Sequence, residues 1–335
     1  MRWSEEQAIA WRRSQPWRCG FNYVTSSAVN STEMWLAASF DATTIARELA
    51  WAGRLGFNGC RVFLQYLVWD AEPVTLLDRF ERFLDLAAAN GLGVMPVLFD
   101  DCAFSGQQPY LGPQAPPVAG VHNSGWTPSP GHQRVTDQAG WPRLEGYATA
   151  FVGRFGNDPR VTVWDLYNEP GNSDLGNRSL PLLRALFGWA RGAAPAQPLT
   201  AGVWNAALGD LNEASIELSD VVSFHCYLDL AGLARGVQDL RTKAGPRPLL
   251  CTEWMARKFG SRFGTHLPYF CRDGIDAYSW GLVKGKTQTH LPWGSPPGAA
   301  EPEEWFHEVL HPDGTPYREE EAAALRRHTG RAGRV

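Results

Sequence analysis

Residues 161–170 read VTVWDLYNEP, an apolar run that stops at a proline. The run Val161–Tyr167 is short, rich in β-branched and aromatic residues, and typical of a buried strand. Pro170 lacks a backbone N–H and ends the hydrogen-bond ladder, so Glu169 is expected at the mouth of that strand. Residues 248–255, PLLCTEWM, repeat the arrangement, because a second apolar run ends at Glu253. The sequence therefore predicts one carboxylate at the end of each of two buried strands.

Further short apolar runs alternate with segments of helical period, and this alternation predicts βαβ units and a parallel sheet. The eight expected strands are Cys19–Tyr23, Gly59–Gln65, Leu92–Phe99, Val161–Tyr167, Leu199–Val203, Val221–Tyr227, Leu249–Glu253 and Ala277–Trp280. The expected helices are Asp41–Leu55, Val74–Asn90, Gln138–Phe155, Leu180–Ala193, Leu208–Leu218, Leu230–Ala244, His266–Arg272 and Arg318–His328.

Eight strands with intervening helices favour a closed (β/α)₈ TIM barrel over an open doubly wound sheet. The segment after the first strand, FNYVTSSAVN, also lacks the glycine-rich phosphate turn that an open sheet usually carries there. A barrel of this kind needs about 250 residues. The 335 residues are therefore interpreted as a single domain, 1–335, enlarged by long loops.

Two irregular segments follow predicted strands. Residues 100–137 follow the third strand, are rich in proline and glycine, and show neither helical nor strand period. Residues 284–303 follow the eighth strand. Loops that follow the strands of a TIM barrel lie at its carboxyl-terminal face, where the active sites of such barrels are found. The two loops are therefore expected to cover part of a pocket on that face.

Composition excludes several classes of protein. The chain has 31 basic and 35 acidic residues, and this balance gives no electrostatic reason to expect binding to nucleic acid or to an anionic membrane. No stretch approaches 18 consecutive apolar residues, so no membrane span is expected. The first residues, MRWSEEQAIAWRRSQPWR, contain no apolar signal core, which predicts a cytoplasmic protein unless a signal was trimmed. The six cysteines form no CxxC pair, so free thiols are expected rather than a zinc site.

The 15 tryptophans are an unusually high number for 335 residues. A Trp-rich core explains them, and so does a cleft lined with flat aromatic faces that bind sugar rings. Strands four and seven lie roughly opposite each other in an eight-stranded barrel, so Glu169 and Glu253 are expected to face one another. Paired carboxylates about 5–5.5 Å apart perform retaining glycoside hydrolysis, in which one donates a proton and the other attacks the anomeric carbon.

The motifs together resemble the clan A glycoside hydrolases, and most closely the cellulase-type members of glycoside hydrolase family 5. The resemblance spans about residues 19 to 282 and is much more specific for the clan than for the substrate. The matching positions, in chain order, are Arg61 in CRVF, Asn168-Glu169-Pro170, His225 and Tyr227 in SFHCY, Glu253 in TEW and Trp280 in YSWG.

The resemblance implies roles for these residues. Glu169 would be the general acid/base and Glu253 the nucleophile, without any metal or organic cofactor. Asn168 would bind the sugar 2-hydroxyl, and Arg61 and Tyr227 would hold the nucleophile. His225 would contact the substrate or the acid/base. Trp280 would form the floor of the sugar site, and in the family the peptide bond after this residue is often cis.

Other rim residues are candidates for substrate binding from their place after a predicted strand. His122, Asn123 and Trp126 of the VHNSGW segment could reach over the sugar or could pack the loop. Trp35, Trp254 and Lys284 are expected on the same rim. Asp100 and Asp101 could bind a metal, although such residues more often cap a loop.

The resulting interpretation is a retaining β-glycosidase that takes carbohydrate as its partner, acts on short glycosides or chain ends, and has an oligomeric state that the sequence leaves open. Two alternatives stay open. One is a metal-dependent sugar isomerase or epimerase that recruits Glu169, His225 and Glu253 as ligands. The other is a non-catalytic carbohydrate-binding barrel.

Overall fold

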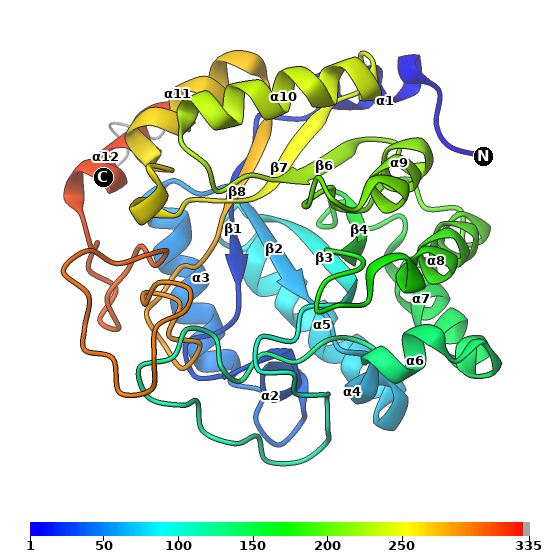
Figure 1. The fold of residues 1–335 in the computed structure, drawn as a ribbon, viewed down its shortest axis with the longest axis horizontal. Helices are drawn as coiled ribbons and strands as arrows, with labels where there is room; N and C mark the ends of the chain where they lie inside the picture. The colour runs from blue at the N-terminus through cyan, green and yellow to red at the C-terminus, as the bar shows by residue number, and fades with distance from the viewer. Residues whose placement is uncertain (331–335) are drawn as a thin grey trace.

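The computed structural model describes residues 1–330. Eight parallel strands, paired in the order β5-β4-β3-β2-β1-β8-β7-β6, line the centre of the molecule (Figure 1). A parallel bridge between Val203 and Phe224 joins the two end strands, so the sheet closes into the predicted (β/α)₈ TIM barrel. The strands are β1 Cys19–Tyr23, β2 Gly59–Phe63, β3 Gly93–Asp100, β4 Trp164–Asn168, β5 Leu199–Thr200, β6 Val222–His225, β7 Leu249–Trp254 and β8 Asp276–Ser279.

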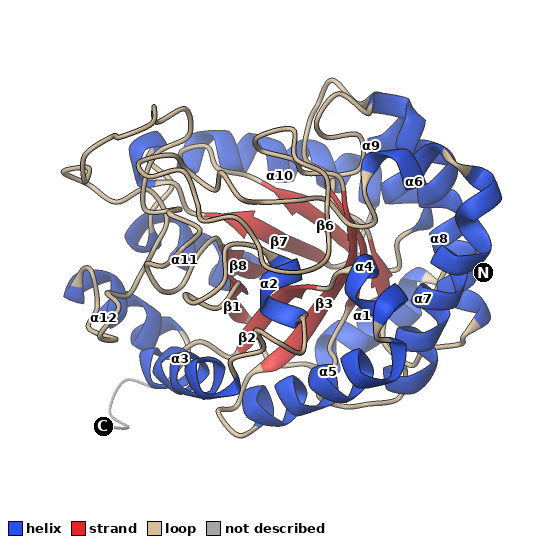
Figure 2. Ribbon diagram, turned by 90° about the horizontal axis from the view of Figure 1, so that it is seen from below, coloured by secondary structure: helices blue, strands red, loops and turns tan. Residues whose placement is uncertain are grey.

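The helices surround the strands as an outer ring, as Figure 2 shows. Their apolar faces pack on the outside of the sheet, so the strands are buried on both sides and read as near-continuous apolar runs. The helices that were predicted are α3 Ala42–Leu55, α5 Pro73–Ala88, α7 Trp141–Phe155, α8 Leu180–Gly192, α9 Gly209–Leu218, α10 Leu230–Ala244, α11 Phe263–Asp273 and α12 Glu319–His328. None of the helices among residues 1–330 is long and apolar enough to cross a membrane.

Four α-helices among residues 1–330 were not predicted: α1 Glu5–Ser14, α2 Ser31–Trp35, α4 Tyr66–Ala71 and α6 His132–Thr136. The last three have only five or six residues, too few to show a helical period. The helix α6 also lies within residues 100–137, which were expected to lack regular structure. The start of α1 did carry a readable signal, because Ser4 and Gln7 form a capping box.

Four strands, the second, fourth, fifth and sixth, are shorter than predicted. The second ends at Phe63 because Gln65 caps the start of α4. The fifth contains only Leu199–Thr200, and Val203 contributes a single bridge beyond it. The carboxyl ends of all eight strands still meet at one face, so their last residues are brought together there.

The amino-terminal end of the barrel is filled by apolar side chains. The indole of Trp11 in α1 packs against a buried layer formed by Met95, Val163, Val221, Leu250 and Tyr278. Arg12, next in α1, pairs with the buried carboxylate of Asp276 in β8. Within residues 1–330, the amino-terminal end of the barrel is therefore closed to a ligand.

The two long loops cross that carboxyl-terminal end together, as the teal and orange segments of Figure 1 show. They are joined by backbone hydrogen bonds from Asn123 N to Thr287 O, 2.8 Å, and from Gly298 N to Ala119 O, 2.7 Å. The side chain of Gln288 adds a bond to Val118 O. The loops therefore form one connected cover over part of the rim.

Gly20 in β1 tests the packing of the barrel interior. An added Cβ at Gly20 would lie 2.3 Å from Tyr278 Cδ1 and 2.9 Å from Gly59 O. We expect Gly20→Ala to lower the free energy of unfolding by about 1–3 kcal/mol, measured by denaturant titration, because this layer is already full. Gly153→Ala on α7 is the matched control, since nothing lies within 4 Å of its added Cβ, and it should leave stability unchanged or raise it. Equal stabilities for the two variants would contradict this packing.

Candidate active site

The guanidinium of Arg61 lies inside the barrel and is fully buried. Its Nε and Nη2 donate to Asp165 Oδ2 at 3.0 and 2.8 Å, and Nη2 also donates to Asn168 Oδ1 at 2.6 Å. Nη1 donates to Asn22 Oδ1 at 2.7 Å and to Glu253 Oε1 at 2.8 Å. All five N–H groups of the arginine therefore have a partner, and one side chain of β2 connects residues of β1, β4 and β7.

Glu253 lies near the end of β7 and accepts hydrogen bonds on both carboxylate oxygens. Arg61 occupies Oε1, and Tyr227 Oη donates to Oε2 at 2.8 Å. Both groups donate a hydrogen bond to Glu253, and neither accepts one from it in this geometry. These two hydrogen bonds therefore favour the ionised form of Glu253 over the protonated one.

Glu169 follows the last residue of β4 and has different partners. Its φ is +42°, a left-handed conformation that is rare outside glycine. Oε2 accepts from Cys102 Sγ at 3.2 Å and from Asn172 Nδ2 at 2.5 Å. Oε1 lies 2.7 Å from His225 Nδ1, at the end of β6. With Oε2 already accepting twice, a proton on Glu169 belongs on Oε1, facing the imidazole.

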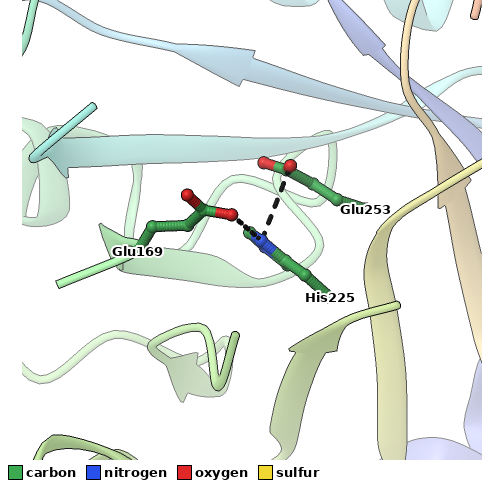
Figure 3. Close-up of side chains that lie close together, drawn as sticks. All are labelled: Glu169, His225 and Glu253. Atoms are coloured by element: carbon green, nitrogen blue, oxygen red, sulfur yellow. Dashed lines mark hydrogen bonds and ion pairs between the residues drawn. The ribbon is translucent and has the colours of Figure 1, made fainter. Parts of the chain in front are cut away.

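Figure 3 shows Glu169, His225 and Glu253 pointing toward one another from three strand ends. One ligand atom from each of the three lies within 4.8 Å of the others. The imidazole stands between the two carboxylates, with Nδ1 3.5 Å from Glu253 Oε2. The two acidic side chains that the sequence predicted to face each other therefore do so.

Burial controls the protonation of this group. It raises the pKa of Glu169, and the donors Cys102 and Asn172 only partly oppose the rise. Burial likewise raises the pKa of Glu253, against the lowering effects of His225 and Arg61. It lowers the pKa of His225 to about 4, so the imidazole is neutral near pH 7. Arg61 contacts Glu253 directly, and no cation among residues 1–330 contacts Glu169, so these neighbours favour a proton on Glu169 over one on Glu253.

The same three residues are also the cluster of described residues best placed to hold a metal ion. The carboxylate oxygens are already engaged, however: Arg61 and Tyr227 occupy Glu253, and Cys102 and Asn172 occupy Glu169. The positive charge of the guanidinium beside Glu253 also opposes a cation. The donor set therefore fits proton transfer better than metal ligation.

A cavity of about 630 Å³ opens above these residues, within the size range of small-molecule sites. It is lined by Glu169, Glu253, Asn168, His225 and Tyr227 together with aromatic side chains. Among the predicted substrate-binding residues, Trp280, Trp126 and His122 also line it. The indoles of Trp126 and Trp280 lie edge to face, with ring centroids 6.1 Å apart and an interplanar angle of 68°, and Trp126 Nε1 donates to Asp100 Oδ2.

The other predicted substrate-binding residues do not line the cavity. Trp254 is fully buried, stacks on His266 and faces α11, because it follows Glu253 in an extended strand and points to the opposite side. Trp35 is fully buried against Phe80 and Phe83 and donates to Phe63 O. In these positions neither indole can contact a molecule in the cavity.

Two polar candidates also lie elsewhere. Asn123 is fully buried within its loop, and Lys284 forms an ion pair with Glu301 outside the cavity. Asp100 and Asp101 accept hydrogen bonds from side chains rather than forming an open metal pair: Asp100 from Asn168, and Asp101 from Tyr167 and Ser179. The peptide bond after Trp280, expected to be cis by resemblance, is not, since Ser129–Pro130 is the cis bond found among residues 1–330.

Several cavity and network residues were missed by the sequence analysis. Asp165 carried a readable signal, because a charged residue in the middle of an apolar strand needs a buried partner. Cys102, Asn172, Trp204 and His307 lie in irregular segments, and only the folded chain brings them to the cavity.

The sequence matches no protein-family model and no curated protein sequence. The structure is nonetheless similar to solved barrels. One is a GH5_18 protein from Streptomyces cattleya in complex with Manβ1-4GlcNAc, at 16% identity over 93% of this chain and 81% of the other, with a TM-score of 0.60. Another is an endo-β-1,4-mannanase from Thermotoga petrophila, at 13% identity over 95% and 77%, with a TM-score of 0.59.

A third similar structure is an exo-β-1,4-mannosidase from Opitutaceae bacterium strain TAV5, at 20% identity and a TM-score of 0.63. The match covers 95% of this chain but only 60% of that longer protein. The barrel fold is therefore one that glycoside hydrolases of family 5 share, as the resemblance implied.

Cys102 provides a test of the electrostatics of Glu169. The thiol donates to Glu169 Oε2 and lowers the pKa of the carboxyl group, so Cys102→Ala should raise that pKa further. The pKa can be measured by ¹³C NMR of carboxyl-labelled glutamate, assigned with Glu169→Gln. The exposed Cys271→Ala is the control and should leave the titration unchanged. A lower pKa of Glu169 in Cys102→Ala would contradict the assigned hydrogen bond.

Proposed function

We propose that this chain is a retaining β-glycoside hydrolase that cleaves short glycosides or chain ends through a covalent glycosyl-enzyme intermediate. The observation that carries the proposal is the pair Glu169 and Glu253. Their oxygens lie within 4.8 Å over a cavity at the carboxyl-terminal end of the barrel, and their partners differ. Retaining enzymes hold their carboxyl groups about 5–5.5 Å apart, whereas inverting enzymes need about 6.5–9.5 Å to admit a water.

In the first step, Glu253 attacks the anomeric carbon and Glu169 gives its proton to the departing oxygen. The bond from carbon to the leaving group breaks as the bond to Glu253 forms. In the second step, Glu169 takes a proton from water, and the resulting hydroxide displaces Glu253 from the sugar. Arg61 and Tyr227 hold the carboxylate of Glu253 in one orientation, so little reorganisation is needed when it attacks.

Asn168 and His225 support these steps. Asn168 donates its amide to Asp100 while its oxygen accepts from Arg61, so its orientation is fixed beside the cavity. His225 lies against Glu169 Oε1 as a neutral ring and can hold the proton of Glu169 until substrate arrives. Trp280, Trp126 and Trp204 offer flat apolar faces to a sugar.

The alternative of a metal-dependent isomerase does not explain why Arg61 and Tyr227 donate hydrogen bonds to Glu253. A non-catalytic binding barrel leaves unexplained why two buried acids converge on the cavity. A screen of 4-nitrophenyl β-glycosides of glucose, mannose, galactose and xylose tests all three functions, with ¹H NMR of the first-formed anomer and a parallel run in EDTA. Hydrolysis with a β-anomer product in EDTA supports the proposal, and an α-anomer product or loss of activity in EDTA contradicts it.

Replacing the nucleophile should abolish turnover. We expect Glu253→Ala to lower kcat by about 10⁴-fold or more, because no other described carboxylate can reach the anomeric carbon from that side. Glu213→Gln on the exposed face of α9 is the control and should retain the full rate. A Glu253→Ala variant with near-wild-type activity would rule out the assigned role.

Replacing the acid should have an effect that depends on the leaving group. Glu169→Gln should lower kcat/KM about 10²–10⁴-fold for alkyl glycosides, which need protonation of the leaving oxygen. The loss for 2,4-dinitrophenyl glycosides should be much smaller in the glycosylation step, since that leaving group departs as the anion. Similar losses in kcat/KM for both substrates would exclude Glu169 as the acid.

The pH profile follows from the same assignment. The acid must be protonated, and burial raises its pKa, so activity should persist above the usual carboxylate range and fall as the pH rises through the pKa of Glu169. The nucleophile must be ionised, so activity should also fall at low pH. In Glu169→Gln the alkaline limb of kcat/KM should disappear for an activated aryl glycoside, and an unchanged limb would contradict the assignment.

A further inference from the structure

Two imidazoles stand side by side in the wall of the cavity, next to Tyr227. His122 belongs to the long loop after β3, and His307 belongs to the irregular segment after β8. Their ring centroids are 5.5 Å apart, both rings line the cavity, and both residues are buried. The roles given above to the catalytic residues do not use either ring.

The protein fixes the tautomer of both rings. His122 Nδ1 lies 2.7 Å from Leu291 O, and His307 Nδ1 lies 2.5 Å from Met255 O. A carbonyl oxygen can only accept a hydrogen bond, so each Nδ1 must carry a hydrogen. In a neutral ring the other nitrogen, Nε2, then carries a lone pair and can only accept.

Both rings are neutral under ordinary conditions. Burial lowers the pKa of His122 to about 4 and holds the pKa of His307 well below its usual value. Neither Nε2 has a hydrogen-bond partner among residues 1–330. Neither Nε2 belongs to the unpaired polar atoms of those residues that are completely buried. The cavity therefore presents two unused acceptors next to each other.

The pair lies close to the nucleophile. The ring of Tyr227 is 5.5 Å from that of His307, and its hydroxyl donates to Glu253. Trp293, half-exposed, packs on Tyr227 and His307 and forms the adjoining wall. Only the ring of Tyr227 therefore separates His307 from Glu253, so a sugar that reacts at Glu253 lies close to these two acceptors.

We propose that His122 and His307 each accept a hydrogen bond from a free hydroxyl of the sugar at this end of the cavity, and so restrict the enzyme to terminal, unsubstituted sugars. This inference rests on the proposed glycosidase function and names its substrate class. A hydroxyl that carries a further sugar or a methyl group has no hydrogen to donate, and it leaves a buried acceptor unpaired. The loop of residues 100–137 provides His122 for this distinction, and the irregular segment that follows residues 284–303 provides His307.

The test uses His122→Asn and His307→Asn. Asparagine keeps a donor near the position of Nδ1, so the bonds to Leu291 O and Met255 O can persist, and it removes the acceptor at Nε2. His311→Asn is the matched control, because that imidazole packs on Trp305 and Tyr317 and does not line the cavity. The substrates are the best 4-nitrophenyl β-glycoside of the screen and its monodeoxy derivatives.

In the wild-type protein we expect two of the monodeoxy substrates to lose kcat/KM by at least about fivefold. His122→Asn should cancel the loss for one of them and His307→Asn the loss for the other, while His311→Asn preserves both. Each comparison is a ratio of two substrates on one variant, so a change in the folded fraction does not affect it.

Losses that stay the same in every variant would overturn the inference while leaving the glycosidase function intact. Equal turnover of parent and deoxy substrates by the wild-type protein would also overturn it. Absence of any glycoside hydrolysis by the wild-type protein would instead refute the proposed function, and this inference with it.

Discussion

The arrangement of this site depends on one buried cation. Arg61 has no contact with solvent and five N–H groups to satisfy, and each unsatisfied group would cost free energy in a medium of low dielectric constant. Asp165, Asn168, Asn22 and Glu253 meet that requirement from three other strands. The register of β1, β2, β4 and β7 is thus tied to a single side chain, and Glu253, the proposed nucleophile, is held as part of the same network.

The network also makes the two carboxyl groups unequal. Glu253 contacts the guanidinium, whereas Glu169 contacts a thiol, an amide and a neutral imidazole. Two nearby carboxyl groups in one buried site titrate as a coupled pair, and their single shared proton goes to the member without a cation. The proposed acid and the proposed nucleophile are therefore distinguished by their neighbours, since the two side chains are chemically identical.

Much of the fold could be predicted because apolar runs, helical periods and a strand-ending proline are local signals. It was harder to predict whether a side chain points into the barrel or away from it. Strand alternation correctly separates Glu253, which points inward, from Trp254, which points outward, and applying it would have removed Trp254 from the predicted site. Glu169 breaks this alternation, because its left-handed backbone turns it toward the cavity beside Asn168.

The loops limited the prediction of the site further. His122 was a candidate from its place after β3, but Cys102 and His307 reach the cavity through irregular backbone that follows no period. The hydrogen bonds between the loop of residues 100–137 and the loop of residues 284–303 join segments more than 160 residues apart, as Gln288 and Val118 illustrate. No local pattern encodes such a contact, since it depends on the closed barrel that brings the two loops to one face.

The central claim is that Glu253 forms a covalent bond to the sugar while Glu169 supplies the proton. The most direct measurement is intact-protein mass spectrometry after incubation with a 2,4-dinitrophenyl 2-deoxy-2-fluoro-β-glycoside of the preferred sugar, followed by peptide mapping. Fluorine at C2 slows both steps, and the activated leaving group lets the intermediate accumulate. We predict a mass increase of one fluorosugar, carried by the peptide that contains Glu253 and absent in Glu253→Ala. A stoichiometric adduct on another residue would contradict the account, as would turnover of the parent glycoside with inversion and no adduct.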